Sequence, residues 1–307
     1  MPTDGQSLAY IILAHKLPDQ LARLVRRLHH PQDLVLVHID AKSDQAPFEQ
    51  ALADLTGPNV RLCRQRFAIH WGGFGEVRAA RSALGLAFEL GHWSHAVLLS
   101  GQDYPIKSQS EIRGFLAAHA DASFMFSSAS RDPWPADGRQ GNDTWYWDGN
   151  LLRLRLRYYR VGRYLVPLPG WWHWGIPGLA RIPGGLRLRQ GSAWWAMHRP
   201  AAQWVLDYGD RRPEVQRFFS RALIPAENYF QMLFDASPFR DQLVQDDLHF
   251  QCWDRWHPRV LSEADLGPLL ASHKLFARKF DADQHPGVLD ELDRHHSAPA
   301  ESSGPAR

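Results

Sequence analysis

The chain has 307 residues, of which 44% are hydrophobic and 22% charged, the proportions of a globular protein with a substantial core. A net charge of +2 argues against a general nucleic-acid-binding protein, and two cysteines, Cys63 and Cys252, exclude a disulfide framework and a thiolate zinc site. The sequence shows neither a signal peptide nor an apolar run of about eighteen residues that would cross a membrane. We therefore expect a soluble, cytoplasmic protein without a transmembrane anchor.

The first half of the chain alternates short apolar runs with stretches of helical spacing. This alternation predicts an α/β fold whose central sheet is mostly parallel and Rossmann-like, with helices on both faces. The predicted strands are residues 8–14, 34–39, 60–63, 96–100 and 123–126. The predicted helices are residues 19–28, 48–55, 76–90 and 111–119.

Polar residues follow three of these predicted strands. They are His15-Lys16, Asp40-Ala41-Lys42 and Ser100-Gly101-Gln102-Asp103. Ligands of parallel α/β sheets bind beyond the carboxyl ends of the strands. The sequence therefore predicts a binding site formed by these three segments.

The alternation breaks down between residues 131 and 190, where Pro, Gly, Trp and Arg dominate. Most of the chain's 13 tryptophans gather in and just after this segment. So many aromatic residues disfavour disorder, and long segments of this kind in globular domains are usually functional. We interpret it as an ordered Trp-rich insertion that forms one wall of a cleft.

The last part of the chain predicts a strand at residues 191–198 and helices at 200–209, 226–234 and 288–294. Glu227 lies in the first turn of the second of these helices. We expect one domain over residues 8–295, with a disordered N-terminus at 1–7 and a disordered tail at 296–307.

Seven segments occur in the order found in one enzyme group. They are AYIILAHK (9–16), VHIDAKSD (37–44), WGGF (71–74), LSGQDYPIK (99–107), GSAWW (191–195), PAENYF (225–230) and LFARKFD (275–281). Over roughly residues 8–283 the chain resembles the core-2/I-branching β-1,6-N-acetylglucosaminyltransferases (glycosyltransferase family 14) and the related peptide O-xylosyltransferases.

This resemblance implies a GT-A-like fold and an inverting transferase that moves GlcNAc or xylose from a UDP-sugar to a hydroxyl of a glycan or peptide acceptor. It also implies that no metal or other cofactor is needed, because the family replaces the Asp-x-Asp metal clamp with basic side chains. The obvious Asp-x-Asp of this chain is Asp281-Ala282-Asp283. It follows the two cations Arg278 and Lys279 and does not follow a mid-domain strand. Residues 8–130 would bind the nucleotide, and residues 131–295 would form the acceptor and catalytic half.

The resemblance assigns the chemistry of transfer to one carboxylate and two cations. Inversion is one in-line displacement, which requires a base beside the acceptor hydroxyl. Glu227 matches the family's base, although a glutamate at a helix N-terminus also stabilises the helix dipole without any catalytic role. Lys279 matches the lysine that binds the diphosphate and Arg259 its arginine partner, with Arg255 and Arg278 as competing candidates.

The nucleotide is expected at the ends of the first two strands. Asp40 would accept hydrogen bonds from uracil or ribose, and His15 and the backbone at Leu13 would flank the base. Trp71 would stack on uracil, or else pack in the core. Lys42 would contact phosphate or ribose, or else be an exposed cation.

The donor and acceptor sugars are expected beyond the central strand, at Ser100 and Asp103. Asp103 would bind a donor-sugar hydroxyl or cap the turn before Pro105, and the two interpretations stay open. Trp253 corresponds to an acceptor-side tryptophan, and Trp194 would pack beneath the cleft. The acceptor region, residues 145–187, does not align with the family.

Two other classes of protein remain as alternatives. A glycoside hydrolase needs two carboxylates that flank the scissile bond, and Glu227 has no evident partner in the sequence. A non-catalytic carbohydrate- or nucleotide-binding protein on the same scaffold would also suit the Trp-rich insertion. A hydrolase should ignore UDP, whereas a binding protein should bind a ligand and leave the donor intact.

Overall fold

A seven-stranded sheet forms the centre of the computed structural model, which describes residues 7–129, 158–161, 164–167, 182–220, 222, 224–254 and 257–297. The strands of this sheet are β1 (Leu8–Ala14), β2 (Leu34–Ile39), β3 (Val60–Leu62), β4 (His95–Ser100), β6 (Ser123–Ser128), β9 (Gln190–His198) and β10 (Leu243–Val244). Their order across the sheet is β10-β6-β9-β4-β1-β2-β3. Only β9 runs against its neighbours, β4 and β6, so the mostly parallel sheet expected from the sequence is confirmed.

The parallel strands end at a common edge. β1 pairs with β2 on one side and with β4 on the other, with Ala14 opposite Ile39 and Leu13 opposite Ser100. β1 and β2 are buried along their whole length, as strands covered on both faces are. The turns that follow β1, β2 and β4 therefore meet at one edge of the sheet.

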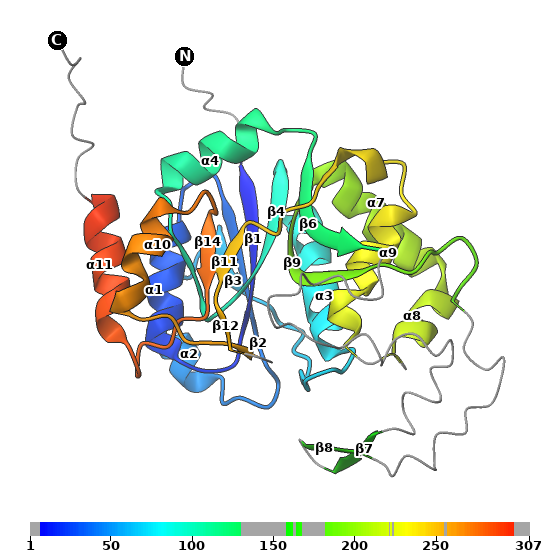
Figure 1. The fold of residues 1–307 in the computed structure, drawn as a ribbon, viewed down its shortest axis with the longest axis horizontal. Coiled ribbons are helices and arrows are strands. Elements are labelled where there is room, and N and C mark those ends of the chain that lie inside the picture. Colours follow the sequence, from blue (N-terminus) through cyan, green and yellow to red (C-terminus); the bar gives the residue numbers. More distant parts are fainter. Residues whose placement is uncertain are drawn as a thin grey trace.

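Helices cover both faces of the sheet (Figure 1). On one side lie α1 (Pro18–Leu28), α2 (Ala46–Ala51), α10 (Leu266–Ala271) and α11 (Pro286–Ser297), and on the other α3 (Gly75–Leu90), α7 (Arg199–Arg211), α8 (Pro213–Phe219) and α9 (Tyr229–Asp235). Side chains of β1 alternate between the two layers: Tyr10 and Ile12 pack with α1, and Ile11 packs with α3. Burial of each large apolar side chain contributes about 1.5–3 kcal/mol.

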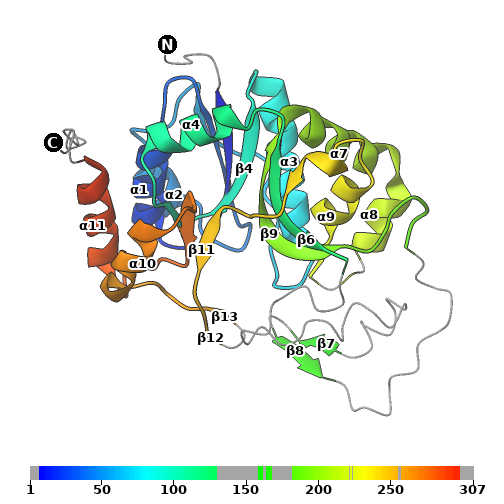
Figure 2. The ribbon, with the colours of Figure 1, turned by 45° about the horizontal axis from the view of Figure 1, so that its top comes forward.

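A second, three-stranded sheet joins the C-terminal part of the chain to the turn after β4. It contains β11 (His249–Gln251), β14 (Phe276–Arg278) and β5 (Asp103–Pro105) in that order. β14 runs antiparallel to β5, with Arg278 opposite Asp103 and Phe276 opposite Pro105. In Figure 2, β11 lies between α10 and β6. The sequence analysis did not foresee this pairing.

The remaining elements are short. They comprise α4 (Gln109–Ala118), the 3-10 turns η2 (Pro225–Glu227), η3 (Arg240–Gln242) and η4 (Glu263–Asp265), and the strand pairs β7 (Tyr158–Val161) with β8 (Tyr164–Pro167) and β12 (Trp253–Asp254) with β13 (His257–Pro258). α4 begins with a capping box, in which the Ser108 hydroxyl accepts from the Glu111 N–H and the Glu111 carboxylate accepts from the Ser108 N–H.

Four expectations about local structure need correction. Glu227 lies in the turn η2 and not in the first turn of a helix, because the helix after it, α9, begins only at Tyr229. α2 ends at Ala51 and not at residue 55. α11 continues to Ser297, so the expected disordered tail begins inside a helix. Ser7 is also ordered, since its carbonyl accepts a hydrogen bond from the Ser94 N–H at 2.7 Å.

Much of the Trp-rich insertion lies outside the described residues, as do residues 1–6 and 298–307. Its role as a cleft wall, the acceptor region at 145–187 and the division into two halves stay predictions. In the part of the chain that the structure describes, no helix has both the length and the apolar character needed to cross a bilayer.

Candidate functional site

Three lysines gather around His15 at the carboxyl edge of the parallel strands. They are Lys16 after β1, Lys42 after β2 and Lys279 after β14, and we call them the lysine cluster. His15 is exposed at the surface, yet partial desolvation lowers its pKa, and the positive charges of Lys16, Lys279 and Lys42 lower it further against the opposing charge of Asp40. Because such effects fade with distance, all three ammonium groups must lie near the imidazole. This edge therefore has a positive potential that suits an anionic ligand.

Lys279 is the most enclosed member of the lysine cluster. Burial lowers its pKa, and the charges of Arg278 and Lys16 lower it further. Lys16 is partly neutralised, because its Nζ lies 2.6 Å from Oδ2 of Asp281. The charges of Asp281 and Asp103 act in the opposite direction, so Lys279 lies among cations and carboxylates, and an anionic ligand would further favour its charged form.

Asp40 is buried and organises the turn after β2. Its Oδ1 accepts hydrogen bonds from the backbone N–H of Lys42 at 2.9 Å and of Ile69 at 3.3 Å, and its Oδ2 lies 3.4 Å from Lys42 Nζ. Lys42 Nζ donates to the carbonyl of Ile69 at 2.5 Å. Asp40 thus joins the turn after β2 to the segment before α3, and its contact with uracil or ribose stays a prediction.

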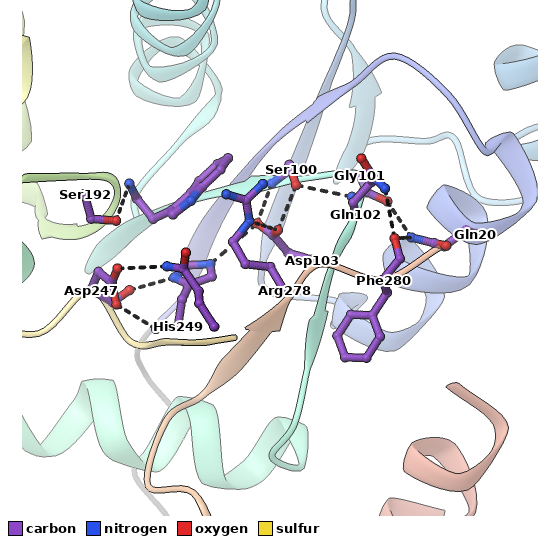
Figure 3. Close-up of polar contacts among 12 residues, drawn as sticks. Gln20, Ser100, Gly101, Gln102, Asp103, Ser192, Asp247, His249, Arg278 and Phe280 are labelled. Carbon is purple, nitrogen blue, oxygen red and sulfur yellow. Dashed lines mark hydrogen bonds and ion pairs between the residues drawn. The ribbon is translucent and has the colours of Figure 1, made fainter. Parts of the chain in front are cut away.

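Asp103 is the hub of a second group of polar side chains (Figure 3). The backbone N–H and the hydroxyl of Ser100 each donate to its carboxylate at 2.7 Å, and Arg278 Nε donates to it at 3.0 Å. His249 Nε2 lies 3.5 Å from its Oδ2. Burial alone would raise the pKa of Asp103, but Arg278 and His249 hold it below its ordinary value. Asp103 is therefore a fixed anion that holds both its own turn and Arg278.

Trp194 supports Arg278 from β9. The guanidinium of Arg278 lies over the Trp194 ring, 4.3 Å from the ring centre, a favourable cation–π geometry. The rings of Trp194 and His249 are 5.7 Å apart. Arg278 is therefore fixed by a charge on one side and an aromatic face on the other.

The backbone also ties β1 to this group. Gly101 N–H donates to the carbonyl of Leu13 at 2.9 Å, so the turn that carries Ser100 is fixed to the end of β1. The Leu13 backbone thereby contacts the sugar-site turn. Whether it also flanks a base stays a prediction.

Glu227 is partly exposed in a turn that other elements hold tightly. Ile224 N–H donates to the carbonyl of Gly72 at 3.0 Å, and Asn228 Nδ2 donates to the carbonyl of Arg189 at 2.8 Å. The turn η2 also contacts β9 and α3. Trp71, whose side chain is 59% exposed, immediately precedes Gly72. The structure thus brings the Trp71 loop and the Glu227 turn together.

A carboxylate that the sequence analysis missed, Glu76, lies in the first turn of α3. Burial raises its pKa, and the opposing charges of Arg278 and Asp103 also act on it, so it lies near both. Its neighbour Gly75 lets the start of α3 lie against the preceding segment, since a Cβ there would lie 2.2 Å from the carbonyl oxygen of Ala68. The sequence marks Glu76 only as an acidic residue after a Gly-rich turn, and no local spacing connects it with Arg278.

Arg259 is engaged by a carboxylate of its own segment, Asp265. Its Nη1 lies 2.7 Å from Oδ2 of Asp265, and its Nη2 also contacts Asp265. This side-chain hydrogen bonding raises the pKa of Arg259 and lowers that of Asp265. Arg278, the competing candidate, neighbours Lys279 and contacts Asp103, whereas Arg255 lies outside the described residues. Trp253 lies partly exposed in the short strand β12.

Among the described residues, no three His, Cys, Asp or Glu side chains lie close enough together to hold a metal ion. In the Asp-x-Asp segment, Asp281 is buried against Lys16, and Asp283 is exposed. Metal independence remains a prediction. The arrangement combines a cationic edge able to hold a polyanion with partly exposed carboxylates able to accept a proton.

Comparison with known proteins assigns the chain to a family. The family model described as "Branch: Core-2/I-Branching enzyme" matches residues 8–271. The chain is 24% identical to human xylosyltransferase 1 over 315 residues, which cover 95% of this chain and 31% of that protein. It is 26% identical to dog xylosyltransferase 2 over 318 residues, which cover 96% of this chain and 34% of that protein. The chain therefore spans about a third of the length of these curated relatives.

A solved structure, 4-diphosphocytidyl-2C-methyl-D-erythritol synthase from Anaerococcus prevotii, overlaps 69% of this chain and 78% of its own. The TM-score is 0.33 and the identity 10%. So low a score supports no conclusion about the site.

Proposed function

Because the chain belongs to the Core-2/I-Branching enzyme family, we propose that it is an inverting, metal-independent glycosyltransferase with a UDP-sugar donor. The acceptor is a hydroxyl group of a glycan or peptide. The observation that carries the proposal is the gathering of the lysine cluster and Arg278 at the carboxyl edge of the sheet. A departing UDP gains negative charge in the transition state, and fixed cations stabilise that charge.

Lys279 is the proposed ligand of the diphosphate. For its arginine partner the contacts favour Arg278 over Arg259, because Asp265 already binds the guanidinium of Arg259 on two nitrogens. Arg278 is adjacent to Lys279 and lowers the pKa of that lysine, so the two charges lie close together. Two neighbouring cations suit a doubly charged leaving group.

The uridine is placed at the ends of β1 and β2. Asp40 binds ribose or uracil, Lys42 binds phosphate or ribose, and His15 and the Leu13 backbone flank the base. The 59% exposure of the Trp71 side chain suits stacking on a planar or sugar ring. Ser100 and Trp253 lie beside the donor and acceptor sugars, whereas the buried Asp103 and Trp194 hold Arg278 in place.

Glu227 is the proposed base. Its carboxylate takes the proton of the acceptor hydroxyl while the hydroxyl oxygen bonds to the anomeric carbon. The bond between that carbon and the UDP oxygen breaks in the same step, which inverts the configuration. The partial exposure of Glu227 leaves it accessible to an acceptor. Of the two donors, UDP-xylose is favoured over UDP-GlcNAc by the similarity to xylosyltransferases 1 and 2.

Thermal unfolding with excess EDTA tests the proposal without knowledge of the acceptor. The protein is measured alone and with UDP, UDP-xylose, UDP-GlcNAc or UDP-glucose. Ligand at about a hundred times its dissociation constant adds about 2.7 kcal/mol of stability, a visible rise in Tm. A rise only with manganese would refute the metal-free site. No rise under either condition would favour a glycoside hydrolase or a glycan-binding protein.

A further inference from the structure

Gln20 of α1 is a buried amide whose hydrogen bonds reach two segments of the candidate site. Its Nε2 donates to the carbonyl of Gly101 at 3.0 Å and to the carbonyl of Phe280 at 3.3 Å. Its Oε1 accepts from the N–H of Ala282 at 2.8 Å. The side chain is 3% exposed, and Figure 3 shows its amide directed toward Gly101 and Phe280. One amide thus uses both of its ends on the backbone of the site.

The partners of Gln20 lie beside residues with proposed roles. Gly101 follows Ser100 in the turn after β4, and Phe280 follows Lys279. Gln102 holds Phe280 from the other side, since its Nε2 donates to the Phe280 carbonyl at 3.0 Å and its own carbonyl accepts from the Phe280 N–H at 2.8 Å. Two glutamine side chains therefore meet at the carbonyl just after Lys279.

We propose that Gln20 is a positioning residue of the diphosphate site, which fixes the backbone of Lys279 relative to the turn that carries Ser100. A lysine reaches its ligand on a flexible four-carbon stem, so the place of its ammonium group depends on how firmly its backbone is held. Gln20 acts through Lys279 and does not touch the nucleotide. The inference rests on the function proposed above.

Gln109, the first residue of α4, offers a matched control. Its Nε2 donates to the carbonyls of Leu28 and His29 at 3.1 and 2.7 Å, at the C-terminal end of α1. Gln109 therefore also uses a side-chain amide to hold backbone, but at the end of α1 remote from the lysine cluster. Replacement of either glutamine by methionine keeps the volume and removes the hydrogen bonds.

The test compares dissociation constants of UDP and of uridine, measured by calorimetry with EDTA at a temperature where circular dichroism shows each variant folded. Gln20→Met should raise the dissociation constant of UDP by about tenfold or more and that of uridine by less than about twofold, since only UDP carries the diphosphate. Gln109→Met should change neither constant by more than about twofold. A general loosening of the fold would not single out the diphosphate.

The inference is overturned if folded Gln20→Met binds UDP like the wild type, or if it weakens UDP and uridine equally. Should Gln20→Met not fold, Gln20→Leu is judged by the same criteria, because it also removes the hydrogen bonds to both carbonyls and to Ala282 and adds no charge. Lys279→Ala distinguishes a failure of the inference about Gln20 from a failure of the proposed function. If the wild type binds UDP and Lys279→Ala weakens it, but Gln20→Met does not, the inference alone fails. If the wild type does not bind UDP, or Lys279→Ala binds it equally well, the proposed function fails as well.

Discussion

Arg278 lies directly opposite Asp103 in the antiparallel pair of β14 and β5, and its Nε donates to the Asp103 carboxylate at 3.0 Å. Asp103 has no exposed surface, and the Arg278 side chain is 17% exposed. Loss of one partner from a buried pair leaves an uncompensated charge, which costs more than the pair itself contributes. The contact therefore connects the stability of the fold with the geometry of the proposed site.

Asp103→Asn should lower the free energy of unfolding by about 3–5 kcal/mol, because Arg278 then stays buried without its counter-charge. Urea unfolding followed by circular dichroism measures this loss. The control is Glu291→Gln, which breaks the exposed pair of Glu291 with Arg294 and should cost less than about 1 kcal/mol. Equal small losses in both variants would show that the Asp103–Arg278 pair is not buried in solution.

Glu227→Gln should reduce sugar transfer by about 10²–10⁴-fold and leave UDP affinity unchanged, because the amide cannot accept the acceptor proton. The comparison variant is Glu76→Gln, which changes a second carboxylate near Arg278. It should retain transfer and bind UDP at least as tightly, since a negative charge near Arg278 is removed. Initial rates with UDP-xylose and calorimetry with UDP measure both effects. Loss of transfer in Glu76→Gln alone would move the base to Glu76.

Lys279→Ala should weaken the binding of UDP by about tenfold or more in the presence of EDTA. A tenfold change corresponds to a loss of about 1.4 kcal/mol of binding free energy. Arg278→Ala should weaken UDP comparably and also lower Tm, because it leaves Asp103 unpaired. Arg259→Ala should change UDP affinity by less than about twofold, since Asp265 already occupies its guanidinium. Calorimetric titration of the three variants decides between the two arginines. Weak UDP binding in Arg259→Ala with normal binding in Arg278→Ala would restore Arg259 as the partner.

Acid should destabilise the protein through its buried histidines. Burial lowers the pKa of His38 and of His95 to about 4, against 6.5 for the ordinary side chain. Between these values the unfolded chain binds a proton that the folded chain does not, so stability falls as the pH drops from 6.5 towards 4. Each of the two histidines should lower the free energy of unfolding by about 2 kcal/mol between pH 7 and pH 5.

Urea unfolding at several pH values measures this dependence. His95→Gln should remove its share of the slope and leave that of His38, whose Nε2 accepts from the Phe67 N–H at 2.9 Å. An unchanged slope in His95→Gln would show that this histidine titrates normally in the folded state.

The fold could be predicted largely because its strands carry local signals. β1 and β2 begin and end where their apolar runs do, since strands buried on both faces are apolar throughout. β14 carries no such signal: it has three residues, and its partner β5 lies more than 170 positions earlier in the chain. Pairing at that separation is decided by tertiary packing and leaves no local pattern.

In the site too, some features follow from local sequence signals and others depend on tertiary packing. The turns after β1, β2 and β4 could be predicted as ligand-binding positions because strand direction alone brings them together. The sequence could not predict three contacts of the site. They are the engagement of Arg259 by Asp265, the place of Glu76 near Arg278 and the hydrogen bonds of Gln20. Each depends on which side chains meet after folding, and one arginine in a motif looks like another in the sequence.

The antiparallel pairing of β14 with β5 also sets the order in which the site can arise during synthesis. Strands β1, β2 and β4 and their turns leave the ribosome early, but Arg278 and Lys279 follow after more than nine-tenths of the chain. A nascent chain that has formed its parallel core therefore still lacks two of its proposed phosphate ligands. Competence to bind the sugar nucleotide should appear late and abruptly, when β14 adds to the edge of β5.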